Sequence, residues 1–395
     1  MSESEFDQLC QETAITLGIQ TLLTTEYRRD LYRESDGHPY VVKILLGEVA
    51  KAGRPQKIER IVAGREEILD ALFERTFVGL SPAAKHVFLT LSGWRSTVPE
   101  LAIEAVMLRP SNERLDVEAA LSELKRCSFV EMTLSPDRNV FLSVPLVAAI
   151  FGKRKLTVSP MKVAVEASTE ILRYLGAAQK TDTQRGVGPR ISSMFTNIAK
   201  KVGGRSEALA EYLPIMEFVA QGYPPAWLLL ARLLEESDIE NNIERAKDAV
   251  GRYLESTSRT KEQIFAWQKR AGYCHLKQDW QGEIHSLVEM SHLPETSFND
   301  ISSAANRINS LLRFHQVLDL YEVKVLVRKL AETMGSRIDN EGDATDCSRL
   351  AWLYLRLDER VMAARLIDHG LSQDPGNEYC SKLKEKLQQQ GTIYV

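Results

Sequence analysis

The sequence predicts a mainly α-helical protein with one small β-hairpin, and three observations lead to this fold class. Apolar residues recur at helical spacing along most of the 395 residues, as in amphipathic helices. A period of two replaces that spacing only between about 129 and 144, which predicts two short strands around a turn. From about residue 157 onward no strand pattern recurs, and glycines and prolines separate one helical stretch from the next. We therefore expect a helical bundle fragment, a small mixed domain, and a helical array.

The composition is that of an ordinary globular protein, with 44% hydrophobic and 26% charged residues and a mean hydropathy of -0.23. The formal net charge of -4 offers no general attraction for a phosphate backbone or an anionic membrane. The longest nearly apolar stretch, Val140 to Phe151, is too short to span a bilayer. Met1 to Gln20 begins with acidic residues where a signal peptide would be basic. We therefore expect a cytoplasmic protein with no membrane contact.

The cysteines predict reduced thiols. They are odd in number, irregularly spaced, and include no C-x-x-C pair, which argues against a disulfide framework or a zinc site. We expect most of them to be small core residues: Cys10, Cys127, Cys274, Cys347 and Cys380.

Residues 1 to 76 should form a helical bundle fragment. Thr24 or Thr25 would cap one helix, and the tetrapeptide Asp36-Gly37-His38-Pro39 would separate it from the next, because Gly can close a helix and Pro can open one. Gly53-Arg54-Pro55 marks a second break. Apolar residues at helical spacing define the three helices: Tyr27 and Leu31; Val41, Val42, Leu45, Leu46 and Val49; then Ile58, Ile61, Val62, Ile68, Leu69, Leu72 and Phe73.

Residues 77 to 156 have the element order of a winged helix. Ser81-Pro82 begins a first helix, because a hydroxyl cap precedes a proline in the first turn. Val98 to Leu108 and Asp116 to Arg126 are predicted as the second and third helices. A hairpin then follows, with Phe129 to Thr133 and Val140 to Val144 as strands around a turn at Ser135 to Asn139.

Residues 157 to 204 are expected to be a helical connector, and residues 205 to 395 an array of helix pairs. The clearest pair lies near the C-terminus, where small and aromatic residues fall on the roughly 34-residue tetratricopeptide (TPR) pattern: Ala351, Tyr354, Ala363, Ile367, Gly370 and Asp374-Pro375. Two earlier repeats, beginning at Trp227 and Trp267, match less well. Leu383 and Leu387 indicate a capping helix after the last pair. This half is therefore predicted to be a TPR-like α-superhelical array.

The segment order resembles the part of a STAND-class NTPase that follows its nucleotide-binding core: helical lid, winged helix, then superhelical sensor. Residues 36 to 43 resemble the G-x-P signature that opens the lid helix, and Ser81 to Phe151 resembles the winged helix. In that family the proline equivalent to Pro39 packs against adenine. The resemblance therefore implies that Gly37 and Pro39 would contact a nucleotide, but only if another chain supplies an NTPase core. The sequence contains no G-x-x-x-x-G-K-[ST] motif, so the likeness implies a fragment, a split subunit or a degenerate relative.

No motif predicts a catalytic residue, a metal site or a bound cofactor. The seven histidines form no H-E-x-x-H or comparable ligand pair. Gly186-Val187-Gly188-Pro189 lacks the preceding strand and the later glycine of a dinucleotide fingerprint, so it is predicted to connect two helices. Acidic pairs such as Glu235-Glu236 are expected to form a solvated helix face. We therefore expect that the chain is not an enzyme.

Nucleic-acid binding is a possible alternative that the charges do not favour. The basic runs Lys153-Arg154-Lys155 and Lys200-Lys201 are predicted at the C-terminal ends of helices, where they complement the helix dipole. The third helix of the predicted winged helix begins with Asp116 and Glu118, which would meet phosphate repulsion in a DNA groove.

The expected function is that of a regulatory or sensor protein whose array binds a protein or another macromolecule. Trp227, Trp267 and Tyr354 lie on the repeat pattern and are predicted core residues, whereas Trp280 follows a loop and is the candidate for contact with a partner. A hinge near Leu156 to Pro160 would transmit binding to the winged helix. The alternatives are a DNA-binding transcription regulator, and a split NTPase subunit that completes an ATP site with a partner chain.

Overall fold

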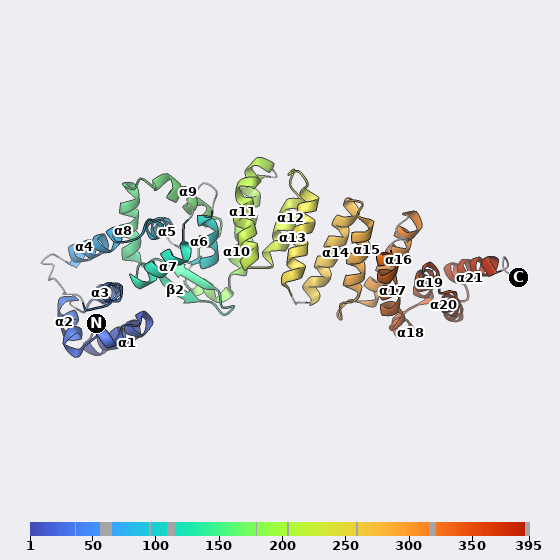
Figure 1. Cartoon of the computed structure of the whole chain (residues 1–395), viewed down its shortest axis with the longest axis horizontal. Helices are drawn as coiled ribbons and strands as arrows, with labels where there is room; N and C mark the ends of the chain where they lie inside the picture. Colours follow the sequence, from blue (N-terminus) through green and yellow to red (C-terminus); the bar gives the residue numbers. More distant parts are fainter. Residues whose placement is uncertain are drawn as a thin grey trace. The chain divides into compact units, whose positions relative to one another are not determined.

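The computed structural model describes residues 1–35, 37–55, 65–94, 96–108, 115–178, 180–203, 205–257, 260–315 and 321–391. It confirms a mainly α-helical fold with one small antiparallel sheet (Figure 1). Contacts divide the chain into two compact units, Met1–Ala226 and Trp227–Val395. Among the described residues, no helix is long and apolar enough to cross a bilayer.

The first unit opens with a small helical bundle made of α1 (Glu3–Leu17), α2 (Thr25–Ser35), α3 (Pro39–Ala52) and α4 (Arg65–Val78). Thr24 caps α2, because its Oγ1 accepts a hydrogen bond from the Tyr27 amide at 3.1 Å. Gly37 has a φ of 62°, and Pro39 begins α3, as the sequence predicted. Some residues of the predicted bundle lie outside the described part: Asp36, Ile58, Ile61 and Val62, and the side chains of Ile68 and Leu69.

A winged-helix arrangement follows in the same unit. Its elements are α5 (Pro82–Gly93), β1 (Val98–Pro99), α6 (Glu100–Met107), α7 (Val117–Arg126), β2 (Glu131–Leu134), β3 (Val140–Ser143) and α8 (Leu146–Thr157). The strands form an antiparallel sheet in the order β1-β3-β2, and Val98 pairs with Leu142. The prediction that a helix begins at Val98 was wrong, because these first two residues are a strand and α6 begins only after Pro99. A two-residue strand has too little alternation to be recognised in a sequence.

Further helices complete the first unit: α9 (Lys162–Arg173), the 3-10 helix η2 (Lys180–Arg185), α10 (Gly188–Val202) and α11 (Ser206–Gly222). Helix α9 packs against α5, where Thr169 Oγ1 donates a hydrogen bond to the Thr90 carbonyl at 3.2 Å. The residues from Leu156 to Pro160, expected to be a hinge, therefore lie inside the first unit.

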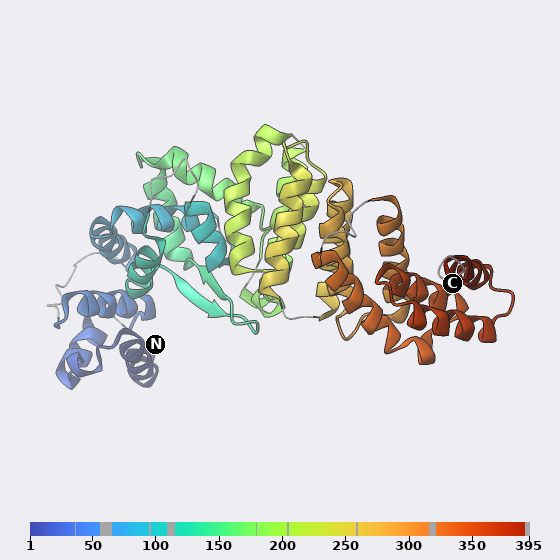
Figure 2. The same cartoon turned by 45° about the vertical axis from the view of Figure 1, so that its right-hand side comes forward.

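The second unit consists of consecutive helices joined by short connections (Figures 1 and 2). They are α12 (Ala226–Glu235), α13 (Asn242–Ser256), α14 (Thr260–Leu276), α15 (Trp280–Ser291), α16 (Phe298–Phe314), α17 (Tyr321–Gly335), α18 (Ile338–Glu341), α19 (Ala344–Arg356), α20 (Arg360–Gln373) and α21 (Glu378–Gly391). Helix α14 packs on α15, α19 packs on α20, and α21 contacts both α19 and α20. This arrangement is a TPR-like array, in which each helix pair buries its apolar face against the next.

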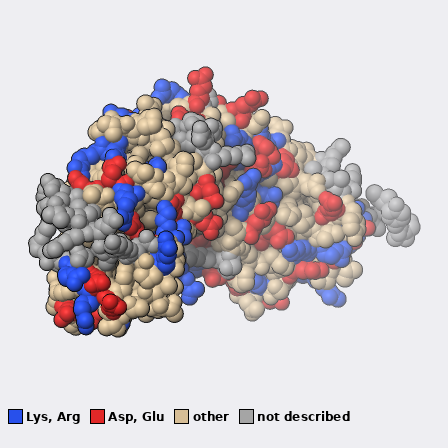
Figure 3. All heavy atoms as spheres, turned by 60° about the vertical axis from the view of Figure 1, so that its left-hand side comes forward, with Lys and Arg blue, Asp and Glu red and all other residues tan. Residues whose placement is uncertain are grey.

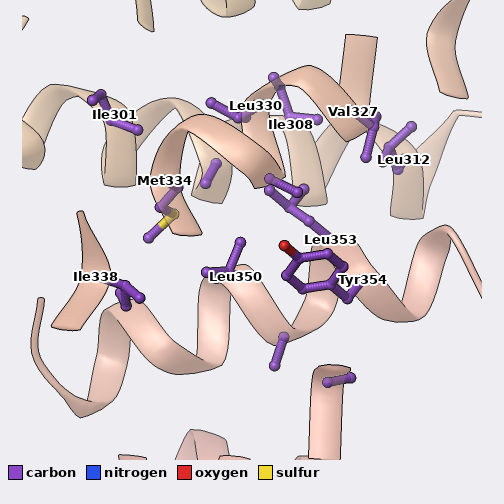
Figure 4. Close-up of a cluster of buried hydrophobic side chains, with 14 of the residues drawn as sticks. Ile301, Ile308, Leu312, Val327, Leu330, Met334, Ile338, Leu350, Leu353 and Tyr354 are labelled. Carbon is purple, nitrogen blue, oxygen red and sulfur yellow. The ribbon is translucent and has the colours of Figure 1, made fainter. Parts of the chain in front are cut away.

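A continuous hydrophobic core runs through the later helices of the array. Figure 4 shows side chains of α16, α17 and α19 that converge between the helices, among them Leu330, Met334 and Leu350. The small residues of the last repeat are buried as the pattern requires: Ala351, Ala363 and Gly370. All five cysteines are free and buried, which confirms the prediction that most are core residues.

Candidate functional site

A cavity that could hold a ligand lies in the C-terminal array, with a volume of about 660 Å³. Its walls come from α16, α19 and α21, and we call it the C-terminal groove. Its lining side chains recur every three or four residues along each helix, so they share one helical face. They are Asn306, Asn309, Ser310, Arg313 and Phe314; Thr345, Ser348, Arg349, Trp352 and Arg356; and Tyr379, Lys382, Leu383 and Lys386.

The position of the groove follows from the repeat architecture. Helices α16 and α19 are the first helices of two successive pairs, and α21 follows the last pair. In stacked helix pairs the first helices line the concave surface, which is the usual binding surface of such arrays. The buried faces of the same helices carry Ile308, Leu350 and Cys380, which fix the orientation of the groove-facing side chains.

The groove is strongly cationic. Three arginines and two lysines are among its lining residues, and no Asp or Glu is. Two of these cations have nearby acidic partners. Arg349 lies 3.3 Å from Asp346 and donates a hydrogen bond to Ser302 Oγ at 2.8 Å, and Lys382 lies 3.0 Å from Glu378.

The other three cations, Arg313, Arg356 and Lys386, form no ion pair within the part of the chain that the structure describes. Lys386 Nζ lies 4.3 Å from the centroid of the Trp352 ring, and the guanidinium carbon of Arg356 lies 5.5 Å from the same centroid. Burial lowers the pKa of Lys386, and the positive charges of Arg356 and Arg313 lower it further. The groove therefore concentrates like charge around one indole ring.

Neutral polar and aromatic groups complete the lining of the groove. Asn309 Nδ2 donates a hydrogen bond to the Arg349 carbonyl at 2.9 Å, which holds α16 and α19 together. Phe314 and Tyr379 are 69% and 62% exposed, values typical of surface polar residues rather than aromatic ones. Together with the half-buried Trp352, they offer flat apolar surfaces beside the cations.

Trp280, which the sequence predicted as a partner contact, does not line this groove. It is the first residue of α15 and is half-buried, and its ring stacks on His315 with centroids 4.1 Å apart. Trp227 and Tyr354 are buried, as expected for repeat-core residues, whereas Trp267 is half-buried. The role of Trp280 toward a partner stays a prediction.

Gly37 and Pro39 lie together at the start of α3. A Cβ on Gly37 would lie 3.2 Å from the Tyr32 ring and from the Met1 carbonyl oxygen, so the residue is closely packed as well as left-handed. Pro39 is exposed in the first turn, where His38 Nδ1 accepts a hydrogen bond from the Val41 amide at 3.4 Å. The geometry is that of a capped helix start, and a contact of these residues with adenine stays a prediction.

The third helix of the winged helix, α7, presents little positive charge. Asp116 caps its N-terminus, and Glu123 Oε2 accepts a hydrogen bond from the Ser81 amide at 3.3 Å. Lys125 is paired with Glu100 at 3.0 Å. The C-terminal end of α7 is covered, because Gly47 of α3 packs directly on the Arg126 carbonyl. Figure 3 also shows Lys and Arg interspersed with Asp and Glu over the face that it draws. The acidic cap, the pairing of Lys125 and the covered C-terminal end disfavour entry of α7 into a DNA groove.

The other candidate motifs have structural partners. The Val187 amide donates a hydrogen bond to Asp137 Oδ2 at 3.0 Å, so the glycine-containing segment before α10 is fastened to the hairpin turn. Arg154 and Lys155 lie in the last turn of α8, as predicted, and pair with Asp70 and Glu74. Within the described residues, no group of three or more His, Cys, Asp or Glu side chains could hold a metal ion.

Comparison with known proteins leaves the family of this chain open. No family model matches the sequence, and no curated protein matches it. Among solved structures, the chain is similar to a Signal Transduction ATPase with Numerous Domains (STAND) protein with a tetratricopeptide repeat sensor from Pyrococcus horikoshii. The identity is 14% and the TM-score 0.31, over 98% of this chain and 57% of that chain. The chain thus spans less than two thirds of the length of that protein.

Proposed function

We propose that this chain is a non-catalytic regulatory or sensor protein whose C-terminal array binds a segment of another protein in the groove of α16, α19 and α21. The observation that supports this proposal is the groove itself, with a volume of about 660 Å³ between successive first helices. That volume lies within the range of about 300 to 1,000 Å³ typical of ligand sites.

The chemistry of the lining favours a polypeptide. Asn306, Ser310 and Thr345 carry amide and hydroxyl groups that both donate and accept hydrogen bonds, as the backbone of an extended peptide requires. Phe314 and Tyr379 provide exposed rings for apolar side chains of the partner. An extended segment could therefore satisfy its backbone and bury side chains in the same groove.

A binding role is also favoured over a catalytic one by what lines the groove. A general base is usually a histidine or a carboxylate, and the lining residues of the described structure include neither. The five free thiols support a cytoplasmic location as part of this proposal.

Site-specific photocross-linking tests the proposal. A photoreactive phenylalanine analogue at Phe314 should cross-link to a partner protein in cells of the source organism, because this ring is exposed at the groove. The matched control is the same analogue at Phe265 of α14, which is 52% exposed and does not line the groove. The expected result is a discrete adduct from position 314 that Trp352→Ala abolishes. An equal yield from position 265, or an adduct insensitive to Trp352→Ala, would contradict it.

A further inference from the structure

We infer that the C-terminal groove selects an acidic peptide segment, whose carboxylates pair with Arg313, Arg356 and Lys386 around Trp352. This inference rests on the proposed function and names the class of partner. The anchoring groups are the three groove cations that have no ion pair in the described structure.

The first argument is electrostatic. Cations gathered in a recess repel one another, and an anion that enters between them relieves this repulsion while forming charge-assisted hydrogen bonds. The lowered pKa of Lys386 follows from burial first and then from this same repulsion, because Arg356 and Arg313 both contribute to lowering it. The residues that line the groove include no carboxylate to offset these charges.

The second argument concerns how the cations are held. Arg356 and Lys386 approach the Trp352 ring from α19 and α21, so two helices hold their charges beside the same indole. Arginine and lysine on an aromatic ring keep their hydrogen-bond donors free for an oxygen ligand. Two carboxylates on one extended segment could engage these two cations beside the ring, and a third could reach Arg313.

Peptide carboxylates fit this groove better than nucleic-acid phosphates do. The remaining cations, Arg349 and Lys382, are already paired with Asp346 and Glu378, so the groove offers few further cations to a continuous phosphate backbone. The formal charge of the whole chain is also negative, at -4. A short acidic peptide needs only the three unpaired cations, whereas a nucleic acid gains affinity from many phosphate contacts.

Fluorescence anisotropy of the full chain tests the inference with three labelled probes. The first is an acetylated eight-residue peptide in which four glutamates alternate with leucines, the second has glutamine in place of glutamate, and the third is an eight-nucleotide uridine RNA. We expect the glutamate peptide to bind at least about tenfold more tightly than the glutamine peptide, with an affinity that falls as salt rises.

Variants locate the site on the protein. Arg356→Ala combined with Lys386→Ala should lower the affinity for the glutamate peptide by at least about tenfold. Lys384→Ala is the matched control. Lys384 lies on α21, as Lys386 does, but it pairs with Asp368 at 2.9 Å and does not line the groove. It should change the affinity by less than about twofold. If the double variant misfolds, Arg313→Ala provides a second measurement of how far a groove cation contributes to the affinity for the glutamate peptide, because it removes only an exposed side chain.

The inference would be overturned by equal binding of the two peptides, by absence of peptide binding, by equal losses in the groove and control variants, or by tighter binding of the RNA. Cross-linking from Phe314 that persisted in any of these cases would leave the proposed function standing, since it would show that a protein occupies the groove without acidic selection.

Discussion

The ammonium group of Lys386 lies over the indole ring of Trp352, with Nζ 4.3 Å from the ring centroid. The two residues come from α21 and α19, so this contact joins the last helix of the array to the helix pair before it. Because Arg356 also approaches the ring, the contact places two positive charges beside one aromatic surface. The groove is therefore a property of the stacked helices and not of any one of them.

The pKa of Lys386 gives a prediction about pH. In the free protein this pKa is lowered, by burial first and then by Arg356 and Arg313. A bound carboxylate favours the charged form and raises the pKa, so the complex binds more protons than the free protein in the window between the two values. The affinity for the glutamate peptide should therefore be full below the lowered pKa and should fall as the pH rises through the raised one.

Anisotropy titrations between about pH 7 and 11 measure this effect. Lys386→Arg is the control, because an arginine keeps its charge throughout this range and should flatten that part of the profile. Identical pH profiles for the two proteins would show that Lys386 does not take part in binding.

Gly370 of α20 tests the packing of the last repeat. A Cβ at this position would lie 2.8 Å from Cys380 Sγ and 3.1 Å from Cys347 Cβ, so Gly370→Ala must push α19 and α21 away from α20. We expect the free energy of unfolding of the array to fall by about 1 to 3 kcal/mol, as in other overpacked cores. Chemical denaturation followed by circular dichroism would measure the loss.

Gly251→Ala on α13 is the matched control for that substitution. A Cβ at Gly251 meets no atom within 4 Å, so the change should leave packing intact and stabilise the helix by about 0.5 to 1 kcal/mol. Equal effects of the two substitutions would show that α20 does not approach its neighbours as closely as described.

Gly47 gives the corresponding prediction for the first unit. It lies in α3, and a Cβ there would clash with the Arg126 carbonyl oxygen at the end of α7. Because backbone cannot move aside as a flexible side chain can, Gly47→Ala should destabilise the contact between the N-terminal bundle and the winged helix by about 2 kcal/mol or more. Hydrogen exchange should become faster in α3. Unchanged protection of α3 in the variant would argue against this contact.

An ion pair between a buried carboxylate and a partly exposed arginine should stabilise the middle of the array. Glu283 of α15 is 4% exposed, and its two carboxylate oxygens accept hydrogen bonds from Arg307 of α16 at 2.6 and 3.2 Å. Arg307→Ala would leave the carboxylate buried without this partner and should cost about 2 to 4 kcal/mol in the free energy of unfolding.

Denaturation of a double-mutant cycle checks this prediction. The cycle uses Glu283→Gln and Arg307→Met, each alone and combined, and the combined variant should be less destabilised than Arg307→Met alone, because it removes both charges. A double variant as unstable as the sum of the two single variants would mean that the pair contributes no coupling.

The sequence predicted those elements whose signals are local. Ser81 and Asp116 cap α5 and α7 as their side-chain chemistry indicates, and the hairpin lies where the period changes to two. The strand Val98–Pro99 was missed, because its only support is its pairing with β3, about 40 residues later in the chain.

The candidate site was predicted only in outline. The concave face of the array follows from the repeat pattern, but Arg313, Trp352 and Lys386 come from three different helices and meet only after the pairs stack. Basic residues at helical spacing on the lining helices were the available signal, as in the four-residue spacing of Lys382 and Lys386 on α21. Trp280 was chosen for the loop before it, and its stacking on His315 depends on a contact with a different helix.

Hydrogen exchange of the full chain, with and without a saturating concentration of the glutamate peptide, tests the central claim most directly. If the peptide binds in the groove, hydrogen exchange should become slower in α16, α19 and α21, the helices that line it. The Arg356→Ala, Lys386→Ala double variant should lose this protection at the same peptide concentration. Protection confined to other helices, or no protection at a concentration at which anisotropy shows binding, would contradict the assignment of the groove as the recognition site.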